Sequence, residues 1–457
     1  MPPTALHDPA ALAQVFKAYD VRGRVPEQLD VDLVRRIGAA FVATTGATDV
    51  VVGHDMRTSS PGLAAAFAEG ASRAGADVVE IGLASTDELY FASGALDRAG
   101  AMVTASHNPA AYNGLKLCHP GARPVGTDTG LTEIRDLVAS GDEPTAEEPG
   151  VRSRRDLLEE YADRLLALAP VSGRPLTVVV DAGNGMAGLT APAVLGRIED
   201  LQVVPMYFEL DGTFPHHEAN PIEPANLRDL RERVVAEGAD IGLAFDGDAD
   251  RCFLVDERGE PVSPSALTSL IAARELAREP GATIIHNLIS SRAVPELVGE
   301  LGGRPVRTRV GHSFIKATMA QENAVFGGEH SGHFYFRDFW YADSGMLAAL
   351  HALAALAGAD VPLSRLVDRY TPYAASGEIN STVEDRERVL TALRNHLDGE
   401  GVTVDELDGT TFTHADWWVN VRPSNTEPLL RLNVEGRDTA TMERLRDESL
   451  AIIRSQP

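Results

Sequence analysis

Short apolar runs that end in polar turns recur along the chain. Residues 50–52, 178–180 and 283–285 are such runs, and apolar runs of this length are typical of buried strands. A helical pattern at residues 31–45 precedes the first of them, and another follows it and ends at about residue 74. Strand, turn and helix together form the α/β unit. Three widely spaced units of the same kind predict three related α/β domains instead of a short-period repeat.

The pattern changes after residues 370–377. Strand patterns now follow one another instead of alternating with helices, which predicts an α+β domain of a different kind. The expected strands are residues 379–383, 402–406, 410–412, 417–421 and 429–434, and the expected helices are residues 385–397 and 439–454.

The segments between these patterns predict where the domains meet. Residues 141–150 are acidic and rich in proline and glycine, as linkers and exposed loops are. Ser263-Pro264 opens a helical stretch, and residues 370–377 precede the change of pattern. A chain of 457 residues is too long for one core. We therefore expect four domains, at residues 1–150, 151–263, 264–370 and 371–457.

Charge and cysteine content narrow the class of protein. Lys and Arg number 41 against 67 Asp and Glu, a net charge of −26, which argues against nucleic acid and anionic membranes as partners. Cys118 and Cys252 form no disulfide framework. The sequence begins with no signal-peptide pattern and contains no apolar run of about 18 residues. We therefore expect a cytoplasmic protein. The sequence does not indicate its oligomeric state.

The run TASHNP at residues 104–109 presents a serine directly after an apolar strand pattern. A hydroxyl nucleophile needs a neighbour that manages its proton or charge, and Lys116 follows on the next expected strand. The alternative interpretation is a turn serine that bonds its own backbone.

The run DGDADR at residues 246–251 lies between two strand patterns. Its aspartates, Asp246, Asp248 and Asp250, can converge on one hard cation through oxygen ligands. Mg²⁺ is the expected cation, because proteins usually bind it through a few carboxylates together with a phosphate oxygen. An EF-hand is excluded because Arg251 stands where that loop needs glycine and because strands, not helices, flank the run.

Two later turns carry further polar groups. The run GGEHSGH at residues 327–333 offers a carboxylate and a hydroxyl between glycines, which suits sugar hydroxyls; His330, His333 and Asp343 could instead form a zinc set. The run RPSNTEP at residues 422–428, followed by Arg431, has the donors that grip a phosphate dianion, although a plain turn is equally compatible.

Together these stretches resemble the α-D-phosphohexomutases, the family of phosphomannomutases and phosphoglucomutases. Their order and spacing are similar to that family from Tyr19 to Arg431. No G-x-S-x-G elbow and no P-loop pattern accompanies them. The resemblance implies three similar α/β domains with mixed sheets and a smaller C-terminal α+β domain around a central cleft. Each domain would supply one stretch: the phosphoserine loop, the metal loop, the sugar loop and the phosphate loop.

The resemblance also implies roles for individual residues. Ser106 would be phosphorylated and would complete an Mg²⁺ site with the three aspartates. Arg22 and Arg251 would steady the transferring phosphoryl group, and Lys116 and His312 would be the candidate general acid and base. The substrate-binding residues implied by the resemblance are Tyr19, Glu329, Ser331, Arg422, Ser424, Asn425 and Thr426.

The reaction implied is the interconversion of mannose 6-phosphate and mannose 1-phosphate through a sugar 1,6-bisphosphate. The GEHSGH run resembles the phosphomannomutase side of the family. A phosphoglucomutase or a dual-specificity mutase is the alternative; a metal-dependent sugar phosphatase and a non-catalytic sugar-phosphate-binding protein are the other classes. The chain departs from the family pattern at His54, where arginine is more usual, and at Asn287, where relatives often carry lysine.

Overall fold

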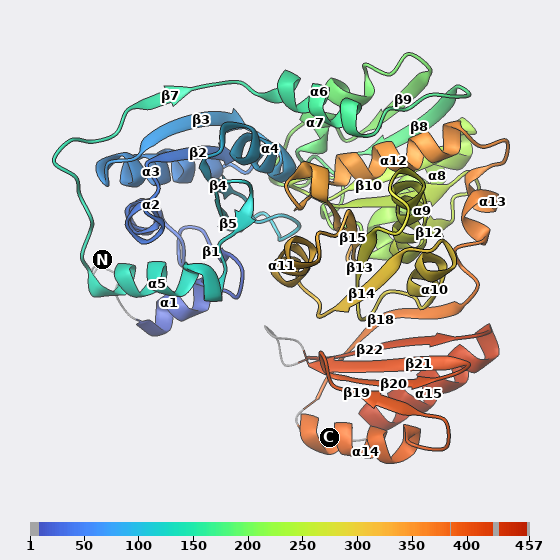
Figure 1. Ribbon diagram of the computed structural model, residues 1–457. Coiled ribbons are helices and arrows are strands. Elements are labelled where there is room, and N and C mark those ends of the chain that lie inside the picture. The colour runs from blue at the N-terminus through green and yellow to red at the C-terminus, as the bar shows by residue number, and fades with distance from the viewer. Residues whose placement is uncertain (1–8, 384, 424–428, 455–457) are drawn as a thin grey trace.

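The computed structural model describes residues 9–383, 385–423 and 429–454. Within these residues the chain folds into four successive units, each built on its own sheet (Figure 1). The first three units combine mixed sheets with helices, and the fourth has an antiparallel sheet. The predicted fold class is confirmed.

The first unit has the strand order β1-β5-β4-β2-β3-β7, with β6 on β5. Its central strands are parallel and β5 is antiparallel. The predicted helix at residues 31–45 is α2. The strands are β1 (Val21–Arg24), β2 (Asp49–His54), β3 (Asp77–Leu83), β4 (Ala99–Val103), β5 (Tyr112–His119), β6 (Arg123–Pro124) and β7 (Arg152–Arg154). The helices are α1 (Pro9–Val15), α2 (Val31–Thr45), α3 (Ser60–Arg73), α4 (Thr86–Leu96) and α5 (Leu131–Ser140).

The second and third units repeat the mixed sheet, in the orders β12-β11-β10-β8-β9 and β14-β13-β15-β16-β17. The second contains β8 (Leu176–Asp181), β9 (Leu201–Met206), β10 (Ile241–Phe245), β11 (Cys252–Asp256), β12 (Pro261–Val262), α6 (Leu158–Leu168), α7 (Ala187–Leu195) and α8 (Arg228–Glu237). The third contains β13 (Thr283–Asn287), β14 (Arg304–Thr308), β15 (Phe326–Gly328), β16 (Phe334–Phe336), β17 (Ala342–Asp343), α9 (Pro264–Arg278), α10 (Ala293–Glu300), α11 (His312–Glu322), α12 (Gly345–Ala357) and α13 (Leu363–Asp368).

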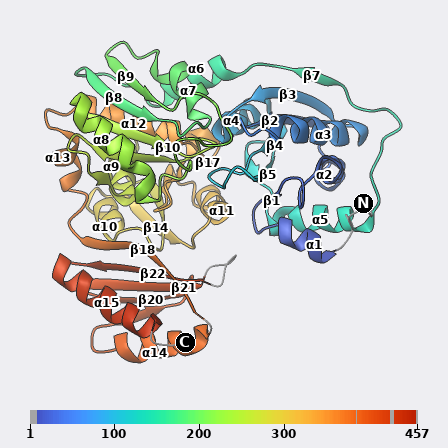
Figure 2. The same ribbon diagram turned by 180° about the vertical axis from the view of Figure 1, so that it is seen from behind.

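The fourth unit has an antiparallel sheet in the order β18-β22-β21-β20-β19, as the run of consecutive strand patterns predicts. It contains β18 (Ala374–Thr382), β19 (Thr403–Asp405), β20 (Thr410–His414), β21 (Trp417–Pro423), β22 (Leu429–Gly436), α14 (Arg386–Leu397) and α15 (Thr439–Arg454). Figures 1 and 2 show it as a separate lobe below the third unit, with its own hydrophobic cluster.

Gly23 lies inside β1, which continues to Arg24. A Cβ at this position would lie 2.8 Å from Cγ1 of Val15, in the helix α1 that packs on the strand. Glycine is here because helix and strand approach closely, not because the strand turns.

The first three units meet around a buried carboxylate at the start of α4. Asp87 accepts hydrogen bonds from Tyr161 Oη of α6 at 2.7 Å and from Ser344 Oγ, the residue before α12, at 2.6 Å. The neighbouring Thr86 donates from Oγ1 to Oδ2 of Asp248 at 2.6 Å. Hydroxyl donors from the second and third units therefore fix the start of α4. Thr86 at this start contacts the acidic loop, the loop that carries the DGDADR run.

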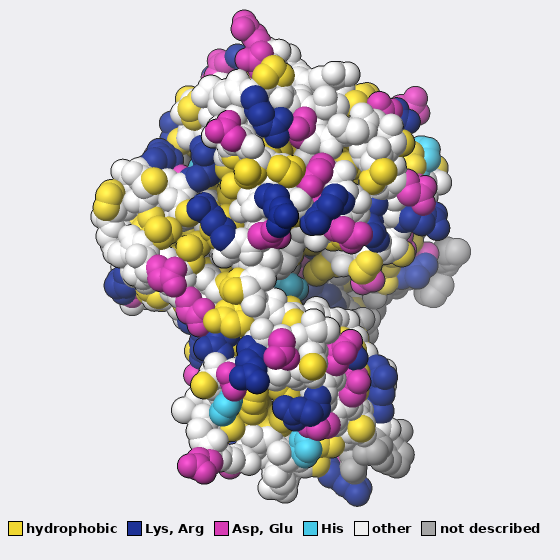
Figure 3. Space-filling view, turned by 90° about the vertical axis from the view of Figure 1, so that its right-hand side faces the viewer, with side chains coloured by type: hydrophobic (Ala, Val, Ile, Leu, Met, Phe, Trp, Pro, Cys, Tyr) yellow, Lys and Arg dark blue, Asp and Glu magenta, His cyan; other side chains and the backbone are white. Residues whose placement is uncertain are grey.

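The outer surface carries charges of both signs. On the face in Figure 3, basic side chains lie among acidic ones instead of forming one large positive area. None of the helices in the described part of the chain is both long and apolar enough to cross a membrane.

The stability of the junction between the first three units depends on pH through Glu88, the residue after Asp87. Burial raises its pKa from the ordinary 4.5 to about 8, and the Asp87 carboxylate adds to the effect. Between about pH 4.5 and about pH 8 the folded protein therefore keeps a proton that the unfolded chain has released. The stability of the fold falls as pH rises through this window. Relative to wild type, we expect Glu88→Gln to raise the free energy of unfolding by about 3 kcal/mol more at about pH 8.5 than at about pH 5.5.

Thermal unfolding of both proteins at the two pH values measures this difference. Glu133→Gln, at an exposed position of α5, is the control and should change stability equally at both. A Glu88→Gln effect that does not grow with pH would contradict the prediction.

Candidate functional site

The serine of the TASHNP run lies in the loop between β4 and β5. Its backbone N–H donates to Thr104 Oγ1 at 2.9 Å, and its φ of +50° lies in the left-handed region that is unfavourable for a residue with a Cβ. Ser106 is only 2% exposed. The loop thus presents a single hydroxyl inward, in a conformation that its surroundings must hold.

The acidic run occupies the loop between β10 and β11, as the sequence predicts. Ligand oxygens of Asp246, Asp248 and Asp250 all lie within 4.8 Å of one another, and each side chain is at most 1% exposed. Oδ1 of Asp248 and Oδ1 of Asp250 have no hydrogen-bond partner. Buried, unpartnered carboxylate oxygens that converge in this way fit a hard divalent cation.

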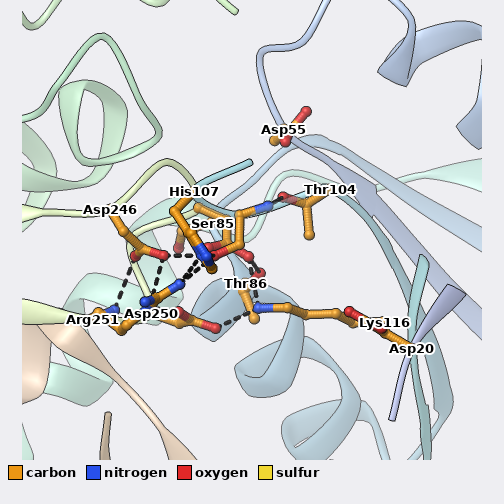
Figure 4. A network of polar contacts seen from close by, with 12 residues as sticks. Asp20, Asp55, Ser85, Thr86, Thr104, His107, Lys116, Asp246, Asp250 and Arg251 are labelled. Carbon is orange, nitrogen blue, oxygen red and sulfur yellow. Dashed lines mark hydrogen bonds and ion pairs between the residues drawn. The ribbon is translucent and has the colours of Figure 1, made fainter. Parts of the chain in front are cut away.

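The two stretches meet directly. Ser106 Oγ donates to Asp246 Oδ2 at 2.7 Å and accepts from Arg251 Nη2 at 2.9 Å, while Arg251 Nε reaches Asp246 Oδ2 at 3.1 Å. Arg251 also contacts Nδ1 of His107. Figure 4 shows Asp246, Arg251 and His107 gathered together. A hydroxyl, a carboxylate and a guanidinium are thus joined in one buried network.

Lys116 reaches the same network from β5. Its ammonium donates to Asp248 Oδ2 at 2.7 Å and also contacts Asp250 Oδ2. Burial alone would raise the pKa of Asp248, but the Lys116 ammonium outweighs burial and holds that pKa below its usual range. Burial raises the pKa of Asp246 to about 7, and the nearby aspartates act in the same direction. The lysine therefore neutralises one side of the acidic loop.

A pocket of about 780 Å³ opens over this network and takes residues from all four units. Its lining includes Tyr19, Arg22 and Arg431 together with the network residues. Arg22 is held by Asp20 at 2.6 Å and by the side chain of Asn108. Cations from the first, second and fourth units therefore line the pocket that contains the serine.

The sugar-loop residues lie in the third unit. Glu329 follows β15 and is 2% exposed; Oε2 accepts from Tyr335 Oη at 2.7 Å, and Oε1 accepts from Asn287 Nδ2 at 3.3 Å and from the Gly311 N–H at 3.2 Å. Ser331 Oγ lies 3.5 Å from Oε2. Among the described residues that line the pocket, neither Glu329 nor Ser331 appears; His333 from the same run does.

The phosphate-loop arginines are held by a carboxylate that the sequence analysis missed. Glu378 of β18 bridges Arg422 Nη2 at 2.7 Å and Arg431 Nη1 at 3.0 Å. Ser424, Asn425 and Thr426 lie outside the described residues, and so does the side chain of His312, whose backbone begins α11.

A second charged group reaches the same pocket through His333 and Asp343, which the sequence analysis named, although it missed their partner Lys316. His333 Nδ1 is 2.9 Å from Asp343 Oδ2, and Lys316 Nζ is 2.7 Å from Asp343 Oδ1. His333 and Asp343 form a possible ligand group with Asp250, and His330 is not part of it. Because an ammonium already occupies the Asp343 carboxylate, this geometry does not favour the zinc alternative. His333 is instead a further group beside the pocket that can carry a proton.

The acidic loop makes a direct prediction about metal binding. Asp248→Asn removes one of three converging charges, so we expect the affinity for Mg²⁺ to fall at least about tenfold. Calorimetric titration of the purified protein measures it. Asp343→Asn is the control, because Asp343 is also buried but pairs with Lys316. The affinity of this variant for Mg²⁺ should stay within about threefold of wild type. Equal losses in both variants would contradict an Asp246–Asp248–Asp250 site.

Comparison with known protein families finds matches along most of the chain. Four domain models described as "Phosphoglucomutase/phosphomannomutase" match the chain in order: domain I at residues 13–145, domain II at 159–259, domain III at 264–373 and the C-terminal domain at 378–452.

Individual relatives match over nearly the whole chain. A phosphomannomutase of Salmonella montevideo is 42% identical over 96% of this chain and 99% of its own length. A protein of Xanthomonas campestris pv. campestris with the name "Phosphohexose mutases" is 43% identical over 95% of this chain and 98% of its own length. A crystal structure of a phosphoglucomutase/phosphomannomutase family protein from Burkholderia thailandensis superimposes with a TM-score of 0.88 at 33% identity, covering 96% of this chain and 98% of the other.

Proposed function

The chain belongs to the phosphoglucomutase/phosphomannomutase family, and from this membership we propose that it interconverts mannose 6-phosphate and mannose 1-phosphate. The protein is a phosphosugar mutase with sugar phosphates as its substrates. Mannose is proposed because relatives at 41–42% identity are named phosphomannomutases.

One observation supports the mechanism most strongly: Ser106 Oγ lies 2.7 Å from Asp246 Oδ2 and 2.9 Å from Arg251 Nη2, beside a pocket of about 780 Å³. A phosphoserine carries a charge of about −1.5 to −2 at neutral pH, so it needs cations on several sides. Arg251 provides one, and Arg22 lines the same pocket. A phosphatase would have no use for a retained phosphoserine together with a second phosphate grip.

In the proposed reaction, phospho-Ser106 gives its phosphoryl group to the free hydroxyl, O1 or O6, of a bound sugar monophosphate. The bond from serine oxygen to phosphorus breaks, and a bond from sugar oxygen to phosphorus forms. Lys116 and His312 are the proposed groups that exchange the proton of the sugar hydroxyl. The bisphosphate then turns over in the cleft, and Ser106 takes back the other phosphoryl group. Such transfers depend on positioning and charge neutralisation more than on covalent chemistry.

Asp246, Asp248 and Asp250 are the proposed ligands of Mg²⁺, with a phosphoserine oxygen beside them. When bound, the cation would neutralise charge on the phosphoryl oxygens. A sugar 1,6-bisphosphate is the proposed activator, because it can phosphorylate Ser106 in a protein that lacks the modification.

The substrate would be held at both ends. Arg422, Ser424, Asn425 and Thr426 are proposed to grip the phosphate that does not react, and Tyr19, which lines the pocket, is proposed to contact the substrate there. Glu329 and Ser331 are proposed to bind sugar hydroxyls. We also propose a cytoplasmic location, because Cys118 and Cys252 are both free and buried.

Mass spectrometry of the purified protein tests the phosphoserine first. We expect a phosphate adduct of about 80 Da on the peptide that carries Ser106, either as isolated or after incubation with a sugar 1,6-bisphosphate and Mg²⁺. Ser106→Ala should lose the adduct and more than about 10³-fold of the mutase activity. Ser140→Ala, at the end of α5, is the control. Full activity without an adduct would exclude the mechanism.

Sugar preference is a separate measurement. Mannose and glucose differ in configuration at O2, so contacts confined to O3 and O4 discriminate weakly. We expect both mannose 1-phosphate and glucose 1-phosphate to react, with kcat/KM higher for mannose 1-phosphate by about tenfold. Turnover of glucose 1-phosphate alone would favour the phosphoglucomutase alternative.

A further inference from the structure

A buried arginine in the turn between β2 and α3 has no part in the chemistry described so far. Arg57 is 1% exposed and is among the largest fully buried side chains of the described chain. Burying a guanidinium is unfavourable unless its donors are satisfied. The question is therefore what Arg57 binds.

Its partners are the backbone of the serine loop. Nη2 donates to the carbonyls of Ser106 at 2.8 Å and Asn108 at 2.6 Å, and Nη1 donates to those of Pro109 and Tyr112 at 3.0 Å each. Nε pairs with Asp55 Oδ2 at 3.2 Å. One planar side chain thus satisfies four carbonyls, three in the serine loop and that of Tyr112 at the start of β5, which only a guanidinium has the donors to do.

The Ser106 carbonyl is confined from the other side as well. A Cβ on Gly247, in the acidic loop, would lie 2.4 Å from this oxygen. The carbonyl is therefore held between the Arg57 guanidinium and the backbone of the loop that carries Asp246 and Asp248. This confinement accounts for the left-handed φ of Ser106, +50°, which a free serine would seldom adopt.

Arg57 is also clamped by the second unit. The ring of Phe214 lies over its guanidinium, 5.1 Å from ring centroid to Cζ, and a Cβ on Gly212 would lie 2.6 Å from the Arg57 Cα. The serine loop belongs to the first unit and the acidic loop to the second. Arg57 therefore connects the serine loop to the unit that carries the proposed metal ligands.

We propose that Arg57 is a positioning residue for phosphoryl transfer: through the loop carbonyls it sets the direction of the Ser106 side chain relative to the acidic loop and to the pocket. This rests on the proposed function of Ser106. Arg57 touches neither substrate nor the reacting atoms, so its loss should affect the transfer step and leave substrate binding nearly intact.

The test uses Arg57→Lys, which keeps the charge but cannot reach four carbonyls, with the full-length protein. We expect kcat to fall about 100-fold, because misplacing a reacting group by about 1 Å costs that much, with KM within about threefold of wild type. Phosphoryl transfer from isolated, ³²P-labelled phosphoprotein to mannose 1-phosphate should slow by the same factor. Released inorganic phosphate should form a larger share of the product, because a misdirected phosphoryl group is open to water.

Arg231→Lys is the matched control. Arg231 also binds a loop carbonyl, that of Gly259 at 2.6 Å, and a carboxylate, that of Glu260 at 3.3 Å, but it lies outside the pocket. Its kcat and product distribution should equal those of wild type. Phe214→Leu, which keeps every Arg57 hydrogen bond, should lower kcat about fivefold at unchanged KM.

The outcomes separate this inference from the proposed function. If wild-type protein yields no labelled Ser106, the proposed function fails. If wild type is labelled but Arg57→Lys transfers its label at the wild-type rate, Arg57 serves stability alone and the inference is overturned. If Arg57→Lys does not fold, Phe214→Leu decides, and an unchanged kcat in that variant overturns the inference.

Discussion

Carboxylates that share a buried loop repel one another, and much of this site is organised by that repulsion. Two unit charges about 4 Å apart interact by about 4 kcal/mol at the effective dielectric near a protein surface. Three such groups lie within 4.8 Å in the loop after β10. Lys116 from the first unit contacts two of them, and Arg251 from the loop itself contacts the third. The acidic loop therefore needs the first unit beside it even before any cation binds.

The same requirement ties the units together. The ion pair from Lys116 to Asp248, the hydrogen bond from Thr86 to Asp248 and that from Ser106 to Asp246 all join the first unit to the second. Asp87 adds hydroxyl donors from the second and third units at the start of α4. Although the chain carries a net charge of −26, the pocket where the units meet is lined by several cationic side chains: Lys17, Arg22, Lys116, Arg251 and Arg431.

Local pattern was enough to predict much of this structure. Apolar runs located the central strands, the helix at residues 31–45 ended where expected, and the acidic run fell between two strands. The pairing of distant side chains was not predictable in the same way. Arg57 binds carbonyls 49 to 55 positions away in sequence, and the Lys316–Asp343–His333 group joins α11 to β17 and the turn before β16. Such contacts depend on how units pack, and hydrophobic periodicity carries no information about that packing.

Glu378 illustrates a constraint that only the folded sheet reveals. Arg422 and Arg431 are direct partners across β21 and β22, and like charges at such positions destabilise a sheet. Glu378 lies on β18, the other neighbour of β22, and its two oxygens take one arginine each. The carboxylate offsets the repulsion and fixes the two guanidinium groups, while Arg431 still lines the pocket. In the fourth unit one carboxylate on a neighbouring strand thus holds two cations, whereas the three aspartates of the acidic loop are held by two cations, Lys116 of the first unit and Arg251 of the loop itself.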